Sequence, residues 1–336
     1  MDESFLKASE EIGKNFNLIQ GAGGNTSFKN GDSMFIKASG YKLKDSLKKD
    51  IFVKVNLRKL RESLKQNLKN PLEDTWDKSL GKRPSMETNM HAILPNKYIF
   101  HTHCLNTISL LVQNECQFKI SKIFNDLKYK IIQYKTPGIP LANEIKKVLK
   151  EDKPEIIFLS NHGLVVCADD IDSALNLTYL VSKKLDFPIS ESKNENLQKL
   201  NQLASGTCFR PTKYKDAHDL AFSDHTIKIA SSGSLYPDHV VFLGPRTLVI
   251  NTKNELEEII KNSKFEQNSP LVIVPHAGIL VPENISFEAE ELVLALSKIV
   301  AKIPNNTKIN YLSLNDECQL KKSNSENYRL SLNSRI

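Results

Sequence analysis

The sequence lacks the features that would place it in a membrane or in a disulfide-rich class. No uninterrupted apolar run reaches the roughly 18 residues that a spanning helix needs, and the N-terminal stretch MDESFLKASEE is acidic without an apolar signal core. The five cysteines are odd in number and never form a C-x-x-C pair, so neither a disulfide framework nor a zinc ribbon is indicated. We therefore expect a soluble cytoplasmic protein with free thiols and no membrane partner.

Arginine is scarce, and the sequence lacks the clustered basic residues that are typical of nucleic-acid-binding proteins. Only seven of the 46 basic residues are arginine, and the lysines are spread over helical faces rather than clustered. The net charge of +7 therefore indicates a solvated surface, which argues against a nucleic-acid partner and is compatible with anionic substrates. No internal repeat is visible in the sequence.

The length of the chain and its apolar content predict two folded units. A chain of 336 residues with 40% hydrophobic residues can bury a large core, and domains average about 150 residues. The composition turns polar in the stretch ISESKNENLQKLNQ, which is the best candidate for a boundary. We expect one domain over residues 1–200 and a smaller α/β extension over residues 206–336.

Strands and helices are expected to alternate through both units. The dipeptide Asn30-Gly31 between two strand-like runs predicts a type I′ hairpin. Pro84-Ser85 introduces a helix over SMETNMHAIL, which Pro95 ends. Further strands are predicted at 51–55, at 97–103 and in the runs KIIQYK, EIIFLS, GLVVCA, HVVFLG, TLVI and PLVIVPHAGIL, and a late helix at about 287–302.

Two histidines stand two residues apart in the strand-like run NKYIFHTHCLN. Alternate side chains of a strand point to opposite faces, so His101 and His103 share one face. Two buried imidazoles side by side could not both be protonated, and burying both as neutral groups is costly. A shared metal ion would use both as neutral ligands, and catalytic zinc usually takes three protein ligands. Two structural histidines remain the alternative.

The third ligand candidate is His162 in FLSNHGLVVCA, on a tight turn between two apolar strands. Its ring should emerge at the end of a sheet, where ligand sites gather, although a solvated turn histidine is the alternative. Glu87 lies one helical turn before His91, close in sequence to the histidine strand. A carboxylate beside a metal is suited to moving a proton at an acidified carbon. Otherwise Glu87 is an ordinary first-turn glutamate favoured by the helix dipole.

The motifs GAGGNTS, KASG, PSMETNMH, HTH and NHGL occur in this order, and with them the chain resembles the class II aldolase/adducin family from residue 5 to about 190. The resemblance implies an α/β (α+β) fold in three αβα layers, with a mixed, largely antiparallel central sheet, in a homo-oligomer that is a tetramer or dimer. It also implies acid/base chemistry at Glu87. The implied ligands of Zn²⁺, or of another divalent metal, are His101, His103 and His162.

Phosphate-binding loops of the similar fuculose- and rhamnulose-phosphate aldolases have counterparts in three short stretches of this chain. Glycine lets backbone N–H groups approach a phosphate, and small hydroxyl side chains add donors. Met86 stands where those aldolases carry a second serine, which leaves open whether the substrate is phosphorylated. The resemblance implies phosphate contacts from Gly24, Asn25, Ser39, Gly40 and Ser85, with Lys37 as a further source of charge.

The reaction implied by the resemblance is cleavage of a ketose 1-phosphate to dihydroxyacetone phosphate and an aldehyde, through a zinc-stabilised enediolate. The same scaffold carries pentulose-5-phosphate 4-epimerases, sugar-acid phosphate decarboxylases and non-catalytic adducin-like binding proteins. The similar epimerases carry aspartate at the position of Glu87, which favours net aldol cleavage. A small-molecule sugar phosphate is therefore the expected partner. The sequence does not place the catalytic tyrosine of the family, although Tyr134 and Tyr236 are candidates.

The segment from residue 206 resembles the tail that follows the aldolase unit in longer, rhamnulose-phosphate-aldolase-like members of the family. In YPDHVVFLGP, an aspartate and a histidine stand just before an apolar run that reads as a strand. We expect Asp238 and His239 to lie at the exposed edge of that strand, with His239 contacting substrate or approaching the metal and Asp238 orienting its ring. The alternative is a loop in which His239 is solvated.

Overall fold

The computed structural model describes residues 2–187, 194–262 and 271–333. The chain divides into two compact units. The first unit comprises Met1–Thr107 and Cys116–Asp186, and the second comprises Ile108–Glu115 and Phe187–Ile336. Within the described ranges, no helix is both long enough and apolar enough to cross a membrane.

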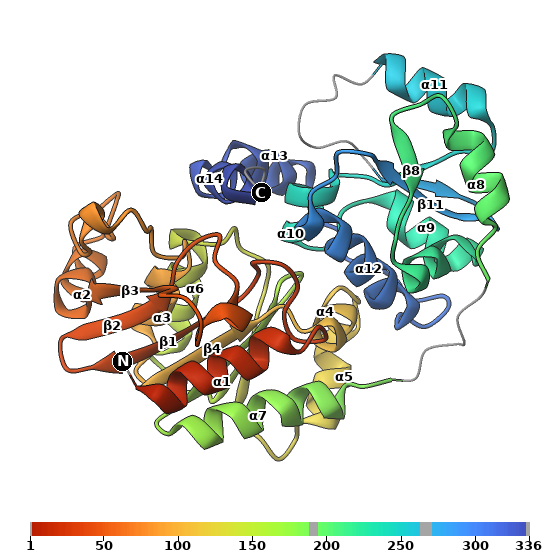
Figure 1. The fold of residues 1–336 in the computed structure, drawn as a ribbon. Helices are drawn as coiled ribbons and strands as arrows, with labels where there is room; N and C mark the ends of the chain where they lie inside the picture. The colour runs from red at the N-terminus through yellow and green to blue at the C-terminus, as the bar shows by residue number, and fades with distance from the viewer. Residues whose placement is uncertain (1, 188–193, 263–270, 334–336) are drawn as a thin grey trace. The chain divides into compact units, whose positions relative to one another are not determined.

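A seven-stranded mixed sheet forms the centre of the first unit (Figure 1). The strand order is β3-β2-β1-β4-β7-β6-β5, and every neighbouring pair is antiparallel except β5 and β6. This arrangement confirms the predicted mixed, largely antiparallel sheet. The strands are β1 (Asn25–Asn30), β2 (Ser33–Lys37), β3 (Phe52–Asn56), β4 (Tyr98–Thr102), β5 (Tyr129–Ile132), β6 (Ile156–Leu159) and β7 (Gly163–Ala168).

Helices cover both faces of this sheet and complete three layers (Figure 1). Met90 of α3 and Leu141 of α6 join Ile99 of β4 in one apolar core on the first face. On the opposite face, the Phe5 ring of α1 packs on the Phe28 ring of β1, with the centroids 5.1 Å apart, and α7 lies beside α1. The helices are α1 (Glu3–Lys14), α2 (Leu57–Lys65), α3 (Thr88–Ile93), α5 (Cys116–Ile123), α6 (Ile139–Val148) and α7 (Ile171–Lys184). Helix α4 (Leu105–Leu111) begins in this unit, and its residues from Ile108 onward belong to the second.

The hairpin between β1 and β2 differs in detail from the prediction. Asn30 pairs with Ser33, so the two central residues of the turn are Gly31 and Asp32. Gly31 has φ +55°, whereas Asn30 and Asp32 are not among the residues with positive φ. A type I′ turn needs positive φ at both central residues, so that part of the prediction is wrong while the hairpin itself is confirmed.

The second unit contains a four-stranded sheet in the order β8-β11-β10-β9. Strands β9 and β10 are parallel, and the other two pairs are antiparallel. The strands are β8 (Phe209–Pro211), β9 (Leu248–Val249), β10 (Val272–Val274) and β11 (Gly278–Pro282). The helices are α8 (Leu197–Ala204), α9 (Asp224–Ser232), α10 (Pro237–Leu243), α11 (Lys253–Asn262), α12 (Phe287–Ala301), α13 (Leu314–Lys322) and α14 (Asn324–Asn333).

The run HVVFLG, predicted as a strand, is helical in the structure and forms most of α10. Pro237 occupies the first turn of the helix, where its missing N–H costs nothing, and every side chain from Pro237 to Leu243 is buried. A short apolar run without polar alternation fits a buried helix as well as a buried strand. The polar stretch expected as a boundary contributes α8 to the second unit, where Leu200 packs in the core, and its residues 189–193 lie outside the described residues.

Candidate metal centre

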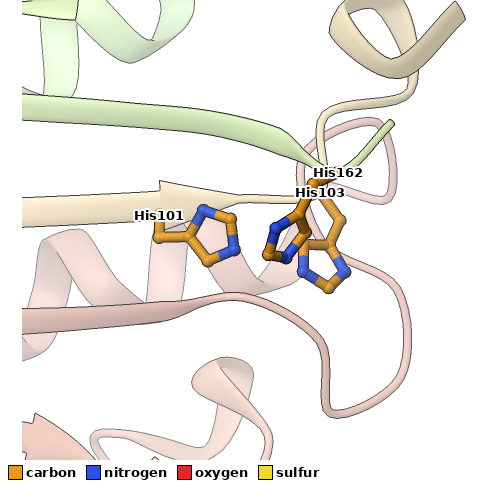
Figure 2. A group of neighbouring side chains, drawn as sticks. All are labelled: His101, His103 and His162. Atoms are coloured by element: carbon orange, nitrogen blue, oxygen red, sulfur yellow. The ribbon is translucent and has the colours of Figure 1, made fainter. Parts of the chain in front are cut away.

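Strand β4 carries the first two histidines of the site. His101 lies inside the sheet, opposite Asn25 of β1 on one side and Val165 of β7 on the other. His103 follows directly after the strand ends at Thr102. Both side chains point to the same side of the sheet, as period-two alternation predicts (Figure 2).

The turn between β6 and β7 brings the third histidine to the same place. Asn161 adopts φ +53°, and His162 N–H donates to the Leu159 carbonyl oxygen at 3.0 Å. A Cβ on Gly163 would lie 2.3 Å from the Thr102 carbonyl oxygen. Only glycine therefore lets β7 approach the end of β4 this closely, and that approach places His162 beside the histidine pair.

The three imidazoles converge on one point and are nearly inaccessible to solvent (Figure 2). The ring centroids lie 5.1 Å apart for His101 and His103, 4.9 Å for His101 and His162, and 5.4 Å for His103 and His162. One nitrogen from each ring can be chosen so that all three lie within 4.8 Å of one another. Three neutral imidazole nitrogens with a nearby carboxylate form a donor set that suits zinc and similar divalent ions.

Hydrogen bonding fixes the orientation of the central ring. His101 Nδ1 donates to the Leu164 carbonyl oxygen at 3.0 Å, which assigns the proton of the neutral ring to Nδ1. His101 Nε2 then faces the site with its lone pair. Backbone carbonyls commonly orient metal-ligating histidines in this way. The geometry therefore fits a metal-binding role for the triad.

Glu87 directly precedes the first residue of α3 and, without capping the helix, turns its carboxylate toward the histidines. Its Oε2 lies 3.3 Å from His101 Nε2, and its Oε1 lies 3.4 Å from His162 Nε2. Burial opposes ionisation, but electrostatic interaction with His101, His162 and His103 and a hydrogen bond from Asn25 outweigh it and lower the pKa of Glu87 to about 2. The structure thus places Glu87 beside His101 and His162, and its acid/base role stays a prediction.

Two of the residues predicted to hold phosphate, Asn25 and Ser85, meet beside Glu87. Asn25 Nδ2 donates to Glu87 Oε2 at 2.8 Å and to Ser85 Oγ at 3.1 Å. Gly24 adopts φ +57°, and a Cβ there would lie 2.7 Å from the His101 carbonyl oxygen. The structure thus gathers Gly24, Asn25 and Ser85 around the histidine triad.

The remaining phosphate-loop candidates lie on the neighbouring loop, at the end of β2. Ser39 N–H donates to the Arg83 carbonyl oxygen at 2.8 Å, which ties this loop to the segment before α3. Gly40 adopts φ +80°. The ammonium of Lys37 is buried and donates to the carbonyl oxygens of Ala22 and Tyr41 at 2.8 and 2.7 Å. A phosphate contact from Ser39 or Gly40 stays a prediction.

His239 lies in α10 of the second unit and is buried, so the expected exposed strand edge is wrong. Its Nδ1 accepts a hydrogen bond from Leu235 N–H at 3.3 Å, and burial lowers the pKa of the ring to about 4. Asp238 forms an ion pair with Arg329 at 2.7 Å, a partner that sequence proximity does not reveal. The role of His239 in substrate binding stays a prediction.

His91 is a buried histidine of α3 to which the sequence assigned no role. Its Nδ1 lies 2.7 Å from Ser27 Oγ, and burial lowers the pKa of the ring well below its usual range. The only sequence signal is its position one helical turn after Glu87. The contact between Asn25 and Glu87 was also not foreseen, because it depends on how β1 aligns with β4.

Residues 3–186 match the family described as class II aldolase and adducin N-terminal domain. The chain belongs to this family. The resemblance noted from residue 5 to about 190 is thereby confirmed, and the matched region coincides closely with the first unit. Family membership and the three converging histidines together indicate an enzyme with a candidate metal site.

Individual relatives are more distant. The chain is 26% identical over 211 residues to the uncharacterized oxidoreductase YuxG of Bacillus subtilis (strain 168), a match that covers 58% of this chain and 30% of that protein. The N-terminal class II aldolase domain of a conserved protein from Thermoplasma acidophilum has a TM-score of 0.48 and 25% identity, covering 54% of this chain and 90% of that one. L-fuculose-1-phosphate aldolase from Thermus thermophilus has a TM-score of 0.38 and 15% identity, covering 55% of this chain and 92% of that one.

Proposed function

We propose that this chain is a metal-dependent aldolase that cleaves a ketose 1-phosphate to dihydroxyacetone phosphate and an aldehyde. The observation that carries the proposal is the meeting of three buried imidazoles with the buried carboxylate of Glu87, 3.3 Å and 3.4 Å from two of the rings. An adducin-like binding protein has no need for such a donor set. The glutamate, in place of the aspartate of the similar epimerases, favours aldol cleavage.

The three histidines would hold Zn²⁺ or another divalent ion. When bound, such an ion supplies Lewis-acid stabilisation of negative charge on the carbonyl and neighbouring oxygens of the substrate. The chain's own contribution is to present the rings in a fixed orientation. The Leu164 carbonyl holds His101 in one tautomer, and the close approach of Gly163 to Thr102 sets the position of His162.

Glu87 is the proposed acid/base group, which moves the proton at the carbon next to the substrate carbonyl. Its carboxylate is buried beside the triad, and the hydrogen bond from Asn25 holds Oε2 in place. General acid–base catalysis of this kind contributes about 10²–10⁴-fold. Because Asn25 Nδ2 donates to both Glu87 and Ser85, Asn25 serves to position the base as well as to line the pocket.

The substrate phosphate is assigned to the short loops around the triad. Backbone N–H groups at Gly24 and Gly40 and the hydroxyls of Ser39 and Ser85 are the proposed donors. Lys37 contributes no direct contact in this proposal, because backbone carbonyls already accept from its ammonium. Inorganic phosphate should therefore compete with the substrate.

The test is aldol synthesis in the reverse direction. Metal-loaded protein is incubated with dihydroxyacetone phosphate and a panel of aldehydes, and new ketose phosphates are sought by mass spectrometry. The proposal expects at least one product, lost in His162→Ala and retained in His276→Ala, which changes an exposed turn histidine of the second unit. Absence of every product, together with interconversion of pentulose 5-phosphates or release of CO₂ from a sugar-acid phosphate, would contradict it.

A further inference from the structure

The sheet of the second unit repeats the metal-binding part of the first, although no repeat is visible in the sequence. The strand order β8-β11-β10-β9 corresponds to β4-β7-β6-β5, with the same two antiparallel pairs and the same single parallel pair. The elements also follow one another along the chain in the same order. In the first unit β4 is followed by α4 and α5 and then by β5, α6, β6, β7 and α7. In the second unit β8 is followed by a 3-10 helix (Lys215–Ala221), α9 and α10 and then by β9, α11, β10, β11 and α12.

The hairpin turns fix how the two copies align. Leu159 pairs with Gly163 across the first turn, and Val274 pairs with Gly278 across the second. The middle residue of each turn has a left-handed backbone, with φ +53° at Asn161 in one and +55° in the other. The next N–H donates to the carbonyl of the last strand residue at 3.0 Å in both turns. Gly163 therefore corresponds to Gly278, with no gap through the hairpin.

The apolar face of the sheet supports the same alignment. With these glycines superposed, five core positions of the first unit fall on core positions of the second, and all ten side chains are buried members of their unit's apolar cluster. On this face α11 takes the place of α6. The equivalent pairs are Ile99 and Phe209, Ile132 and Ile250, Ile157 and Val272, Leu159 and Val274, and Val165 and Leu280.

None of the three metal-ligand positions carries a histidine in the second unit. Pro211 pairs with Leu280 as His101 pairs with Val165, so Pro211 takes the first ligand position. Lys213, two residues on, stands in place of His103. Ala277, directly before the turn glycine, stands in place of His162. The equivalent pairs are thus His101 and Pro211, His103 and Lys213, and His162 and Ala277.

The space at Ala277 is also filled, whereas Lys213 is exposed to solvent. Ala277 is fully buried in the apolar cluster that contains Leu200 of α8, and a Cβ on Gly278 would lie 3.0 Å from Leu200 Cδ1. The Ala277 carbonyl accepts from Asn196 N–H at 2.9 Å, at the start of α8. Lys213 turns its ammonium to Glu290 Oε2 at 3.4 Å. Apolar packing at Ala277 and an ion pair at Lys213 therefore stand where the first unit has two of its metal ligands.

We infer that the second unit is a copy of the metal-binding half of the aldolase fold in which the metal site has been replaced by apolar packing. The chain accordingly holds one metal ion, on the first unit, and the second unit retains a latent site that three histidines would restore. This inference does not depend on which reaction the first unit catalyses. A wrong assignment of the reaction would leave it standing.

The first test is metal stoichiometry of the intact protein, measured by elemental analysis after loading with zinc and removal of excess metal. One ion per wild-type chain and none in His103→Ala/His162→Ala are expected. Two ions per wild-type chain, or one ion retained in the double variant, would overturn the inference. This measurement needs no variant of the second unit, so it decides even where a redesigned second unit does not fold.

The second test rebuilds the site in that double-variant background. Pro211→His, Lys213→His and Ala277→His supply the ligands, and Leu200→Ala makes room for the rings. Metal content should rise from about zero to about one ion per chain, and Co²⁺ should show the visible absorption of a tetrahedral site. The control carries Leu200→Ala without the histidines and should stay metal-free. A rebuilt variant that folds, as judged by circular dichroism, yet binds no Co²⁺ would show that the strands do not correspond as inferred.

Discussion

The two units of this protein place different chemistry at the same point of the same strand arrangement. Where the first unit gathers His101, His103 and His162 under the carboxylate of Glu87, the second places a proline, a lysine and an alanine and closes the space with Leu200. The strand order, the turn and the core face are shared. The fold therefore supplies a location for a site, and the side chains at three positions decide whether the location becomes one.

The shared turn shows which features belong to the fold and which to the site. A glycine opens the return strand in both units, because a Cβ would lie 2.3 Å from the Thr102 carbonyl oxygen in one and 2.4 Å from His218 Nδ1 in the other. The residue two positions before this glycine has a left-handed backbone in both units, at Asn161 and at His276. The motif Asn-His-Gly therefore owes its asparagine and glycine to the backbone geometry and only its histidine to metal binding.

The largest effect is expected from removing one ligand. His103→Ala leaves two imidazoles, too few for a stable catalytic site, so both bound metal and the proposed aldolase activity should be lost. The matched control is His276→Ala, in the equivalent turn of the second unit, which should keep full metal content and activity. Elemental analysis and turnover are measured on both proteins. Metal at wild-type stoichiometry in His103→Ala would remove this residue from the ligand set.

Loss of the hydrogen bond to the base should have the next largest effect. In Asn25→Ala the Glu87 carboxylate loses the amide that holds Oε2 at 2.8 Å. Turnover should fall by about 10–100-fold, as for other residues that orient an active group, with metal content unchanged. Asn30→Ala, at the exposed end of the same strand, is the control and should be silent. Equal turnover in the two variants would reduce Asn25 to a pocket-lining residue.

The turn glycines should tolerate alanine poorly in both units. Gly163→Ala and Gly278→Ala each force a methyl group against a packed neighbour, and Gly278 also has φ +141°. Each change should lower the free energy of unfolding by about 1–3 kcal/mol. Denaturant titration followed by circular dichroism measures the loss. A large loss at Gly163 with none at Gly278 would break the equivalence of the two turns.

The smallest effect is expected from replacing the N-cap residues of α7 and α12, the helices that follow the two hairpins. Asp170 accepts from Ser173 N–H at 2.7 Å, and Ser286 accepts from Ala289 N–H at 3.2 Å. Replacing either residue with alanine should cost about 1 kcal/mol of stability. Asp172→Ala, an exposed first-turn residue of α7, should cost less because it caps no N–H group. Thermal melts of the three variants measure the difference.

The features that the sequence predicted well depend on short-range rules. Period-two alternation placed His101 and His103 on one face, and the turn signal placed His162 at a strand end. The position of Glu87 followed from its place at the start of α3. Local pattern was enough to place each of these residues on its element, whereas their convergence depends on the pairing of β4 with β7.

The features that the sequence missed depend on long-range partners. The register of β1 on β4 places Asn25 opposite His101, and Glu87 lies beside that histidine. Asn25 therefore meets Glu87 only in this register, and no local signal sets it. The run that became α10 has no polar alternation to separate strand from buried helix. The repeat stayed hidden because it is preserved in strand pairing and in core positions that accept different apolar residues, such as Ile99 and Phe209.

The central claim, that Glu87 moves a proton beside a metal held by the three histidines, is tested most directly by proton exchange. Wild-type and Glu87→Gln proteins, both loaded with metal and assayed for metal content, are incubated with dihydroxyacetone phosphate in deuterated water. Exchange at the carbon next to the carbonyl is then followed by NMR. We expect the variant to keep its metal and to exchange about 10²–10⁴-fold more slowly. Exchange at the wild-type rate in a metal-loaded variant would contradict the assignment.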